Sequence, residues 1–311
     1  MTDDASESML PGLPAPAPAG TSALPEGTYD GSVVLVTGGG SGLGKAIATE
    51  FARLGADLVI AGRKEERLKA ARDELAGLGG RVAATPCDIR DPDRVAEVFD
   101  AAQEAYGLPD VLVNNAAANF PVPAEDMSPN AWRSVVDITL NGTFFMTREF
   151  ARRHLATGTP GSVINIGASY AWTGGPGFAH SAAAKAGVKS LVESLAVEWG
   201  PYGIQVNGLV PGLMPHEDMT ADIRGNLDRA ATTEEREPGI QRRELGSHQP
   251  ALRVGAPREL GWAATFLASP YARFITGHTL VVDGANWQRR GLVSPEVVTV
   301  REQMGRGRFG G

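Results

Sequence analysis

The stretch Ser32–Gly44, SVVLVTGGGSGLG, joins a short apolar run to a cluster of glycines and the start of an amphipathic segment. Apolar runs of this length that end at glycine are typical of buried strands. Glycines permit a tight turn and a close approach of phosphate, while the following helix offers free N–H groups and a positive dipole end. The stretch therefore predicts a strand, a turn and a helix that together bind the pyrophosphate of a dinucleotide.

The rest of the chain continues this alternation of strand and helix. Apolar strands separated by helices predict an α/β fold, a single Rossmann-type domain with a parallel sheet covered by helices on both faces. Further strands are expected at 57–62, 81–88, 110–116, 162–169, 204–212 and 278–284, with helices at 64–76, 92–106, 128–154, 178–199 and 257–267.

Three segments fall outside the predicted domain of residues 31–286 or interrupt its alternation. Residues 1–30 are rich in Pro, Ala and Ser and carry no base, so we expect a disordered tail with little apolar surface to bury. Residues 214–254 are polar and follow the sixth strand; this position favours a substrate lid over a disordered excursion. The basic segment 287–311 is expected to lie on a neighbouring subunit or to stay free.

Composition excludes several classes of protein. The net charge of −7 argues against a nucleic-acid binder, whose surface should be basic. The single cysteine, Cys87, excludes internal disulfides and a cysteine-built zinc site, and no metal site is predicted. We interpret Cys87 as a small buried residue at a strand end. Because the chain has no run of about 20 apolar residues and no secretory signal, we expect a cytoplasmic protein without a membrane span.

The end of the second strand indicates the type of dinucleotide. Ala61-Gly62-Arg63-Lys64 places two cations, and no carboxylate, where NAD-binding proteins carry an acid for the ribose hydroxyls. Cations at this point favour the 2′-phosphate of NADPH. The alternative is an ordinary solvated helix start, since Glu65 and Glu66 follow at once. Asp88, after the third strand, is expected near the adenine.

Several independent motifs occur in one order: TGGGSGLG from Thr37, Asn114-Asn115-Ala116-Ala117, Asn141, Lys185 and Pro211-Gly212. From about Ser32 to Gly284 the chain resembles the short-chain dehydrogenase/reductase family. The resemblance implies a doubly wound, seven-stranded sheet, a nicotinamide cofactor and a homotetramer. The cofactor contacts expected from the glycine cluster, the strand ends and the resemblance are Gly38, Gly40, Ser41, Gly42, Leu43, Gly44, Arg63, Lys64, Asp88, Ile89, Asn115, Lys185, Pro211, Gly212 and Leu213.

The catalytic segment departs from the usual pattern of that family. The usual pattern has a tyrosine four residues before the lysine and a serine about thirteen before the tyrosine. Here those positions hold Ser181 and Ala168, while Tyr170 stands fifteen residues before Lys185. A ketone reductase of the usual kind would lack its proton donor, so the protein is either inactive or has a different chemistry.

With the stretches NNAAANF, SPNAW and LNGT, this arrangement closely resembles 2,4-dienoyl-CoA reductases of the mitochondrial type. In those enzymes the tyrosine lies at the end of the fifth strand, and a serine occupies the vacated helix position. The resemblance implies that Tyr170 and Asn119 donate to the thioester oxygen. It implies that Lys185 holds the nicotinamide ribose and, with Ser181, orders a water for proton delivery. It also implies acyl-CoA contacts from Arg90, Asn119, Phe120 and Ser128.

A displaced tyrosine fits reduction of a conjugated thioester. In a ketone the hydride goes to the carbon that carries the oxygen, so the acid must stand beside the nicotinamide. In a dienoyl thioester the hydride attacks the far end of the conjugated system, and charge develops on an oxygen several bonds away. Donors are effective where that charge appears. We therefore expect an NADPH-dependent reductase of 2,4-dienoyl-CoA or a related unsaturated acyl-CoA in fatty acid β-oxidation, giving by resemblance a trans-3-enoyl-CoA.

Two other functions remain open. One is a dehydrogenase of a hydroxyacyl-CoA, ketone or steroid-type substrate, against which the missing tyrosine at Ser181 counts. The other is an inactive NADP-binding scaffold, against which Lys185 and Asn119 count. Tyr170 alone could be an aromatic that packs under the Trp172 loop. We assign no role to the neighbouring His180.

Overall fold

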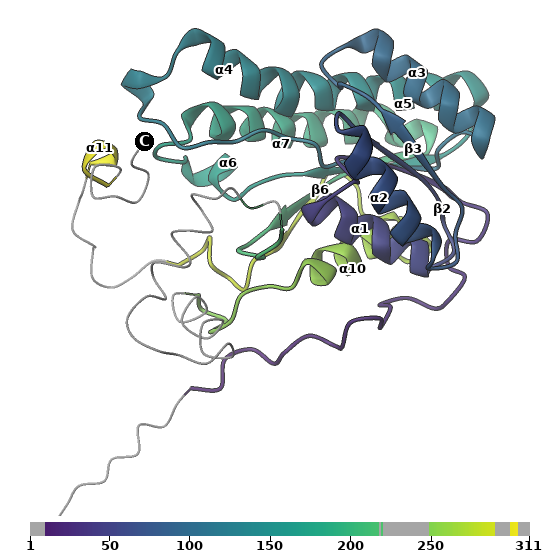
Figure 1. The fold of residues 1–311 in the computed structure, drawn as a ribbon, viewed down its shortest axis with the longest axis horizontal. Coiled ribbons are helices and arrows are strands. Elements are labelled where there is room, and N and C mark those ends of the chain that lie inside the picture. The colour runs from purple at the N-terminus through teal and green to yellow at the C-terminus, as the bar shows by residue number, and fades with distance from the viewer. Residues whose placement is uncertain (1–9, 218, 220–248, 290–298, 304–311) are drawn as a thin grey trace, which may run out of the picture.

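The computed structural model describes residues 10–217, 219, 249–289 and 299–303 (Figure 1). In this part of the chain seven parallel strands form one sheet of order β3-β2-β1-β4-β5-β6-β7, which confirms the predicted doubly wound α/β fold. The strands are β1 (Val33–Thr37), β2 (Asp57–Gly62), β3 (Val82–Pro86), β4 (Val111–Asn114), β5 (Gly161–Ile166), β6 (Ile204–Pro211) and β7 (Thr279–Val282).

Helices cover both faces of this sheet, and successive side chains of β1 show why. Val34 and Val36 face the core beneath α1, α2 and α10, whereas Val33 and Leu35 face the core beneath α3, α5 and α7. Because side chains alternate along a strand, an all-apolar strand needs cover on both sides. The helices are α1 (Gly42–Arg53), α2 (Glu65–Ala76), α3 (Pro92–Ala105), α4 (Pro129–Val136), α5 (Thr143–Thr157), α6 (Tyr170–Thr173), α7 (Ala179–Trp199), α10 (Pro257–Ala268) and α11 (Val300–Gln303).

The helix expected over residues 128–154 is interrupted. Ser128 is its N-cap, as the Ser-Pro pair indicates, and its Oγ accepts a hydrogen bond from Ala131 N at 3.1 Å. A π-helical segment, Asp137–Gly142, then separates α4 from α5. Inside this segment Asn141 donates to Asp137 at 2.9 Å. Such π segments are rare and frequently occur at functional sites.

The fifth strand is shorter than expected. It ends at Ile166 rather than at residue 169, and Tyr170 begins the one-turn helix α6. Tyr170 is therefore not part of the strand but lies just beyond its carboxyl end, where parallel α/β sheets bind ligands.

The amino-terminal segment departs from the expected disordered tail over residues 10–30, which lie along α10 (Figure 1). Arg253 Nε donates to Pro14 O at 2.9 Å, and Trp262 Nε1 donates to Thr21 O at 2.9 Å. Tyr29 is 3% exposed and packs edge-to-face on the α1 ring Phe51. An extended proline-rich backbone leaves its carbonyl groups free to accept such bonds, a gain that counting apolar residues overlooks.

The other expected excursions are only partly described. Most of the expected lid at 214–254, and most of the basic segment at 287–311, lie outside the described residues. Within the described part, Arg301 of α11 forms ion pairs with Glu125 and Asp126 of the same chain, at 3.0 Å each. This residue therefore neither stays free nor needs a neighbouring subunit for its partners. No described helix combines the length and apolar character needed to cross a membrane.

Candidate active site

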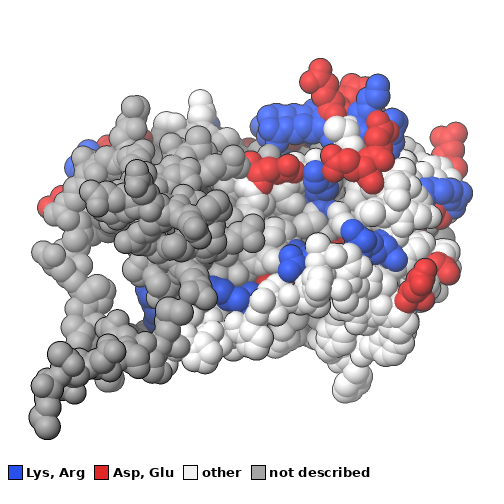
Figure 2. Space-filling view, turned by 60° about the horizontal axis from the view of Figure 1, so that its bottom comes forward, with Lys and Arg blue, Asp and Glu red and all other residues white. Residues whose placement is uncertain are grey.

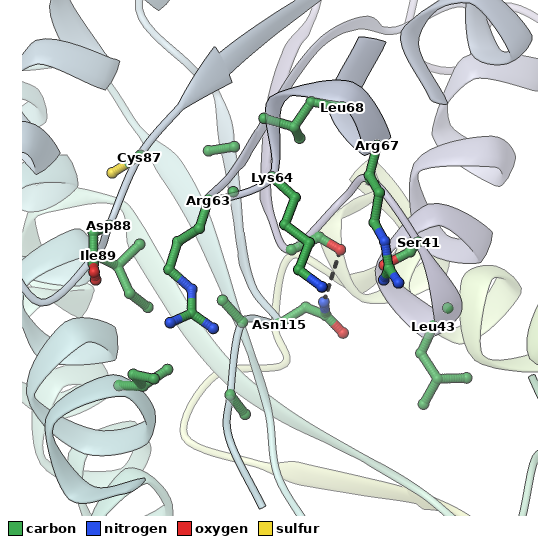
Figure 3. A pocket seen from close by; sticks show the side chains of 18 of the residues that line it. Ser41, Leu43, Arg63, Lys64, Arg67, Leu68, Cys87, Asp88, Ile89 and Asn115 are labelled. Carbon is green, nitrogen blue, oxygen red and sulfur yellow. Dashed lines mark hydrogen bonds between the residues drawn. The ribbon is translucent and has the colours of Figure 1, made fainter. Parts of the chain in front are cut away.

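The glycine loop between β1 and α1 forms one wall of a cleft of about 420 Å³ (Figure 3). Gly38, Gly40, Ser41, Gly42 and Leu43 line it. Gly38 and Gly42 have φ of +66° and +53°, values that favour glycine. The cleft opens at the carboxyl ends of the strands, above the amino terminus of α1, as expected for a dinucleotide site.

Two side chains fix this loop from behind. Asn115 Nδ2 donates to Thr37 O at 3.0 Å, and the Thr37 hydroxyl accepts from the backbone N–H groups of Asn115 and Ala116 at 3.0 Å each. A Cβ at Gly44 would collide with the Gly38 carbonyl and the Asn115 amide. Gly44 therefore lies behind the loop and lets these groups meet, while Asn115 both supports the loop and lines the cleft.

Three cations line the cleft where β2 passes into α2. Arg63 and Lys64 were expected there, and Arg67, one helical turn later, joins them (Figure 3). Among the described lining residues, Asp88 on the opposite wall is the single carboxylate. The cleft thus offers guanidinium and ammonium donors, with the size and the glycine cradle of a dinucleotide pocket. The residues present fit the nucleotide that the sequence implies.

The negative charge of Asp88 is balanced by an ion pair with Arg90. The Arg90 guanidinium approaches both of its carboxylate oxygens, at 2.9 and 3.0 Å from Nε. This hydrogen-bonded pair lowers the pKa of Asp88, which keeps it ionised. Ile89, between them, is 5% exposed and also lines the cleft. Arg90 itself is exposed and lies outside the described lining of the cleft.

Cys87 is buried at the end of β3, as expected, and it also borders the cleft. Burial is the main cause that raises the pKa of its thiol to about 11. The thiolate that reacts with oxidants and alkylating agents is therefore scarce at neutral pH, and Cys87 serves as a packing residue.

Tyr170 is hydrogen-bonded to Ser181: their hydroxyl oxygens are 2.9 Å apart. The first residue of α6 thus meets the first turn of α7. Burial raises the pKa of Tyr170, and the bond to Ser181 opposes this only in part. Tyr170 is therefore a neutral phenol, able to donate a hydrogen bond. Trp172, two residues later, stacks on Trp287, with ring centroids 5.3 Å apart.

Lys185 lies one turn after Ser181 on the same face of α7. It is 6% exposed, and its Nζ donates to the carbonyl of Ile166, the last residue of β5. Burial lowers the pKa of Lys185 to about 8. Ala168, where the usual family pattern has serine, lines a small cavity together with Trp172 and Lys185. The ammonium group keeps two further hydrogens to donate.

The residues assigned to the acyl group lie less close to one another than Tyr170 and Ser181 do. Phe120 packs against His180 of α7, with ring centroids 4.6 Å apart, so the loop after β4 does reach α7. Asn119, beside it, is exposed and has no hydrogen bond to another described residue. The structure thus pairs Tyr170 with Ser181 rather than with Asn119. Ser128 is exposed and engaged as the helix cap.

The residues expected after β6 border a second cavity of about 310 Å³. Gly212 and Leu213 line it, with Asp283 from the end of β7. Gly212 N donates to Val282 O at 2.9 Å, which ties the two strand ends together. Pro211 ends β6 and lines neither this cavity nor the cleft at the glycine loop, within the described chain.

Sequence reasoning did not assign to the cofactor several residues that line the nucleotide cleft, among them Arg67, Leu68, Ile138 and His216. Arg67 carried a usable signal, because a residue three or four positions into a helix lies over its first turn. Leu68 was indistinguishable from a core residue, which it also is. His216 follows β6 in a segment without periodicity and carried no signal.

A sequence model of the family described as Enoyl-(Acyl carrier protein) reductase matches residues 38–285. A Bacillus subtilis (strain 168) protein named as a probable 2,4-dienoyl-CoA reductase producing (2E)-enoyl-CoA is 39% identical over 255 residues, 82% of this chain and 96% of that protein. A Caenorhabditis elegans protein named as a probable 2,4-dienoyl-CoA reductase producing (3E)-enoyl-CoA is 40% identical over 263 residues, 84% of this chain and 82% of that protein.

Solved structures agree with these relatives. A crystal structure of a short chain dehydrogenase from Bacillus anthracis matches with a TM-score of 0.72 and 38% identity, over 82% of this chain and 96% of that chain. A citronellol catabolism dehydrogenase of Pseudomonas aeruginosa PAO1 matches with a TM-score of 0.72 and 35% identity, over 86% of this chain and 99% of that chain. The fold, the glycine loop and these similarities agree: the chain belongs to the short-chain dehydrogenase/reductase family of oxidoreductases.

Proposed function

We propose that this oxidoreductase is an NADPH-dependent reductase of 2,4-dienoyl-CoA or a closely related unsaturated acyl-CoA. The observation that carries the proposal is the hydrogen bond between Tyr170 and Ser181, next to the buried Lys185. The phenol of Tyr170 comes from α6, whereas the usual family tyrosine would stand at position 181 on α7. The names of the relatives from Bacillus subtilis and Caenorhabditis elegans support the same substrate class.

The family and the fold imply a nicotinamide cofactor, and we propose that it is NADPH. The reduced nicotinamide supplies a hydride when bound. Arg63, Lys64 and Arg67 would hold the 2′-phosphate, since guanidinium groups bind phosphate with charge-assisted, often bidentate hydrogen bonds. Lys185 would donate its two remaining hydrogens to the ribose hydroxyls.

Tyr170 would stabilise the negative charge that develops on the thioester oxygen. When the far carbon, C5, accepts a hydride, electrons shift along the conjugated chain and an enolate oxygen forms at C1. A hydroxyl group donates one hydrogen, so Tyr170 can donate to this oxygen only if Ser181 donates to Tyr170. The Ser181 hydroxyl is placed for that relay at 2.9 Å, and the raised pKa keeps the phenol proton on Tyr170.

The remaining assignments concern the acyl-CoA. The exposed amide of Asn119 is a second candidate donor to the thioester oxygen. Phe120 would contact the acyl chain, and Arg90 and Ser128 the more polar part of the substrate. Ser181, whose own hydrogen goes to Tyr170, would accept a hydrogen bond from the water that delivers the final proton, and Lys185 would hold this water through the ribose hydroxyls that it binds. We further propose a cytoplasmic homotetramer, as expected for a family member of this kind.

The proposal is tested by a screen of CoA thioesters with NADPH and NADH side by side. A 2,4-dienoyl-CoA should lose its conjugated absorbance as NADPH is consumed, whereas ketones and alcohols without CoA should not react. Protonation of the dienolate at C2 gives a 3-enoyl product and protonation at C4 a 2-enoyl product, and relatives are named for each. Chromatography of the product identifies the carbon. Turnover of simple ketones with no reaction of any enoyl or dienoyl thioester would contradict the proposal.

The cation cluster makes a separate prediction about cofactor choice. The variants Arg63→Ala and Arg67→Ala should each lower kcat/KM for NADPH by about 10-fold to 100-fold, because each removes hydrogen bonds to a charged group. The kcat/KM for NADH should stay near the wild-type value. Arg72→Ala is a matched control, because Arg72 lies on the same helix but pairs with Asp73. Equal use of both cofactors by the wild-type protein would contradict the assignment of a 2′-phosphate site.

A further inference from the structure

Helix α7, which carries Ser181 and Lys185, begins without an ordinary cap. The residue at its N-cap position is Phe178, which has no side-chain acceptor. The first N–H groups of a helix have no partner within the helix and must find another acceptor. Ala182 N is satisfied by Phe178 O at 2.9 Å. The Ser181 N–H needs an acceptor from elsewhere.

His180 supplies that acceptor. Its Nδ1 lies 2.8 Å from Ser181 N, and the residue is completely buried. Because the backbone N–H can only donate, Nδ1 must accept, so the neutral ring carries its hydrogen on Nε2. Burial is the main influence on the pKa of His180 and lowers it, while a hydrogen bond with the Phe178 backbone acts in the opposite direction. The neutral form that this capping bond requires is therefore the favoured form.

The same ring contacts the loop that follows β4. The rings of His180 and Phe120 meet at 88° with centroids 4.6 Å apart. A second tie joins the two segments, since Val122 N donates to Gly177 O at 2.8 Å. The Nε2 atom is buried without a hydrogen-bond partner among the described residues. A buried polar atom without such a partner is costly, so packing alone does not explain a histidine here.

We infer that His180 is a positioning residue for the reaction: its Nδ1 fixes the backbone of Ser181, and its ring seats Phe120. The inference rests on the proposed function, since it assigns Ser181 to the catalytic pair and Phe120 to acyl binding. One side chain thus holds the Tyr170–Ser181 bond and the acyl-binding loop in a single arrangement.

Two substitutions separate these roles. His180→Phe keeps a ring beside Phe120 but removes the acceptor for Ser181 N, so kcat for a dienoyl-CoA should fall by about fivefold to 100-fold with KM little changed. His180→Asn keeps an acceptor at the place of Nδ1 but removes the ring, so KM for the dienoyl-CoA should rise by about twofold to tenfold with kcat little changed.

His154→Phe is the matched control for loss of a buried histidine. His154 is 2% exposed and forms hydrogen bonds with Pro109 O and Thr159, just before the amino ends of β4 and β5. This variant should lose thermal stability without either kinetic change. Similar kinetic effects in the His154 and His180 variants, scaling with lost stability, would overturn the inference.

Amide hydrogen exchange resolved to Ser181 tests the capping bond without any substrate. The Ser181 N–H should exchange faster in His180→Phe than in the wild type, and at the wild-type rate in His180→Asn. Unchanged protection in His180→Phe would overturn the inference even if the wild type reduces dienoyl-CoA. A wild type that reduces no dienoyl-CoA would instead contradict the proposed function, while the exchange result would still decide the role of His180 at Ser181.

Discussion

Tyr170→Phe is expected to lower kcat for a 2,4-dienoyl-CoA by about 10²-fold to 10³-fold, the usual cost of losing one donor to a developing oxyanion. The substitution removes one oxygen atom and leaves the ring that packs against Gly175 in place. The KM for NADPH should stay near the wild-type value, because the proposal assigns the Tyr170 hydroxyl to the thioester oxygen and not to the nucleotide. Initial rates at saturating NADPH measure the effect.

Two controls show whether this loss of kcat is caused by the loss of the Tyr170 hydroxyl, which is bonded to Ser181. Tyr202→Phe removes a hydroxyl from an exposed tyrosine and should leave kcat unchanged. Ser181→Ala removes the group that orients Tyr170 but not the donor itself, so its loss of kcat should be smaller than that of Tyr170→Phe. Wild-type activity in Tyr170→Phe would remove Tyr170 from the mechanism.

Lys185→Met is expected to lower kcat/KM for NADPH by about 10²-fold or more, because two hydrogen bonds from a charged group are lost together. Methionine keeps an unbranched chain that fills the same buried space. Lys189→Met is the control: Lys189 lies one turn later on α7 and pairs with Glu193 rather than with the site. A loss of similar size in both variants would contradict the proposed role of Lys185.

The buried ammonium also predicts two pH effects. The pKa of Lys185 in the folded protein, about 8, lies below its ordinary value of 10.5. Wild-type kcat/KM for NADPH should therefore fall as pH rises through about 8, where the free enzyme loses this charge. Between pH 8 and 10.5 the unfolded chain holds more protons than the folded one, so the contribution of Lys185 to stability rises with pH.

Denaturant unfolding measures the second effect. Lys185→Met should be more stable than the wild type near neutral pH, where a charged lysine is buried, and this advantage should shrink above pH 8. An advantage that does not change with pH would show that the lysine is not titrating in this range.

The sheet and the nucleotide site could be predicted because their signals are local. Each strand of this parallel sheet is a short apolar run, and the run Val33–Thr37 passes directly into the glycine loop. The cations Arg63 and Lys64 follow β2 in sequence, so their place at the cleft follows from the topology alone. Arg67 needed the additional step of assigning the helical phase of α2.

Other features depend on contacts between distant segments. The π segment Asp137–Gly142 cannot be distinguished from a continuous α-helix by apolar spacing. The place of residues 10–30 depends on donors from Arg253, Arg258 and Trp262, more than 200 positions away. The Tyr170–Ser181 bond crosses a loop between two helices, so spacing of eleven residues carried no information about it.

The surface shows why the pattern of charged residues in the sequence does not locate the candidate site. In Figure 2 basic and acidic side chains are interspersed over the described part of one face. The net charge argues against a nucleic-acid binder, but it does not locate the candidate active site, which includes a few buried polar side chains such as Lys185 and Ser181. His180 illustrates this limit, because a histidine beside Ser181 has no sequence signature that distinguishes a cap from a loop residue.

The most direct test of the central claim is the structure of the protein with NADP and a 2,4-dienoyl-CoA or its product. Our account predicts the thioester oxygen at hydrogen-bond distance from the Tyr170 hydroxyl, about 2.7–3.1 Å, with Ser181 still bonded to Tyr170. A thioester oxygen held by other groups, with the Tyr170 hydroxyl bonded to Ser181 alone, would contradict it.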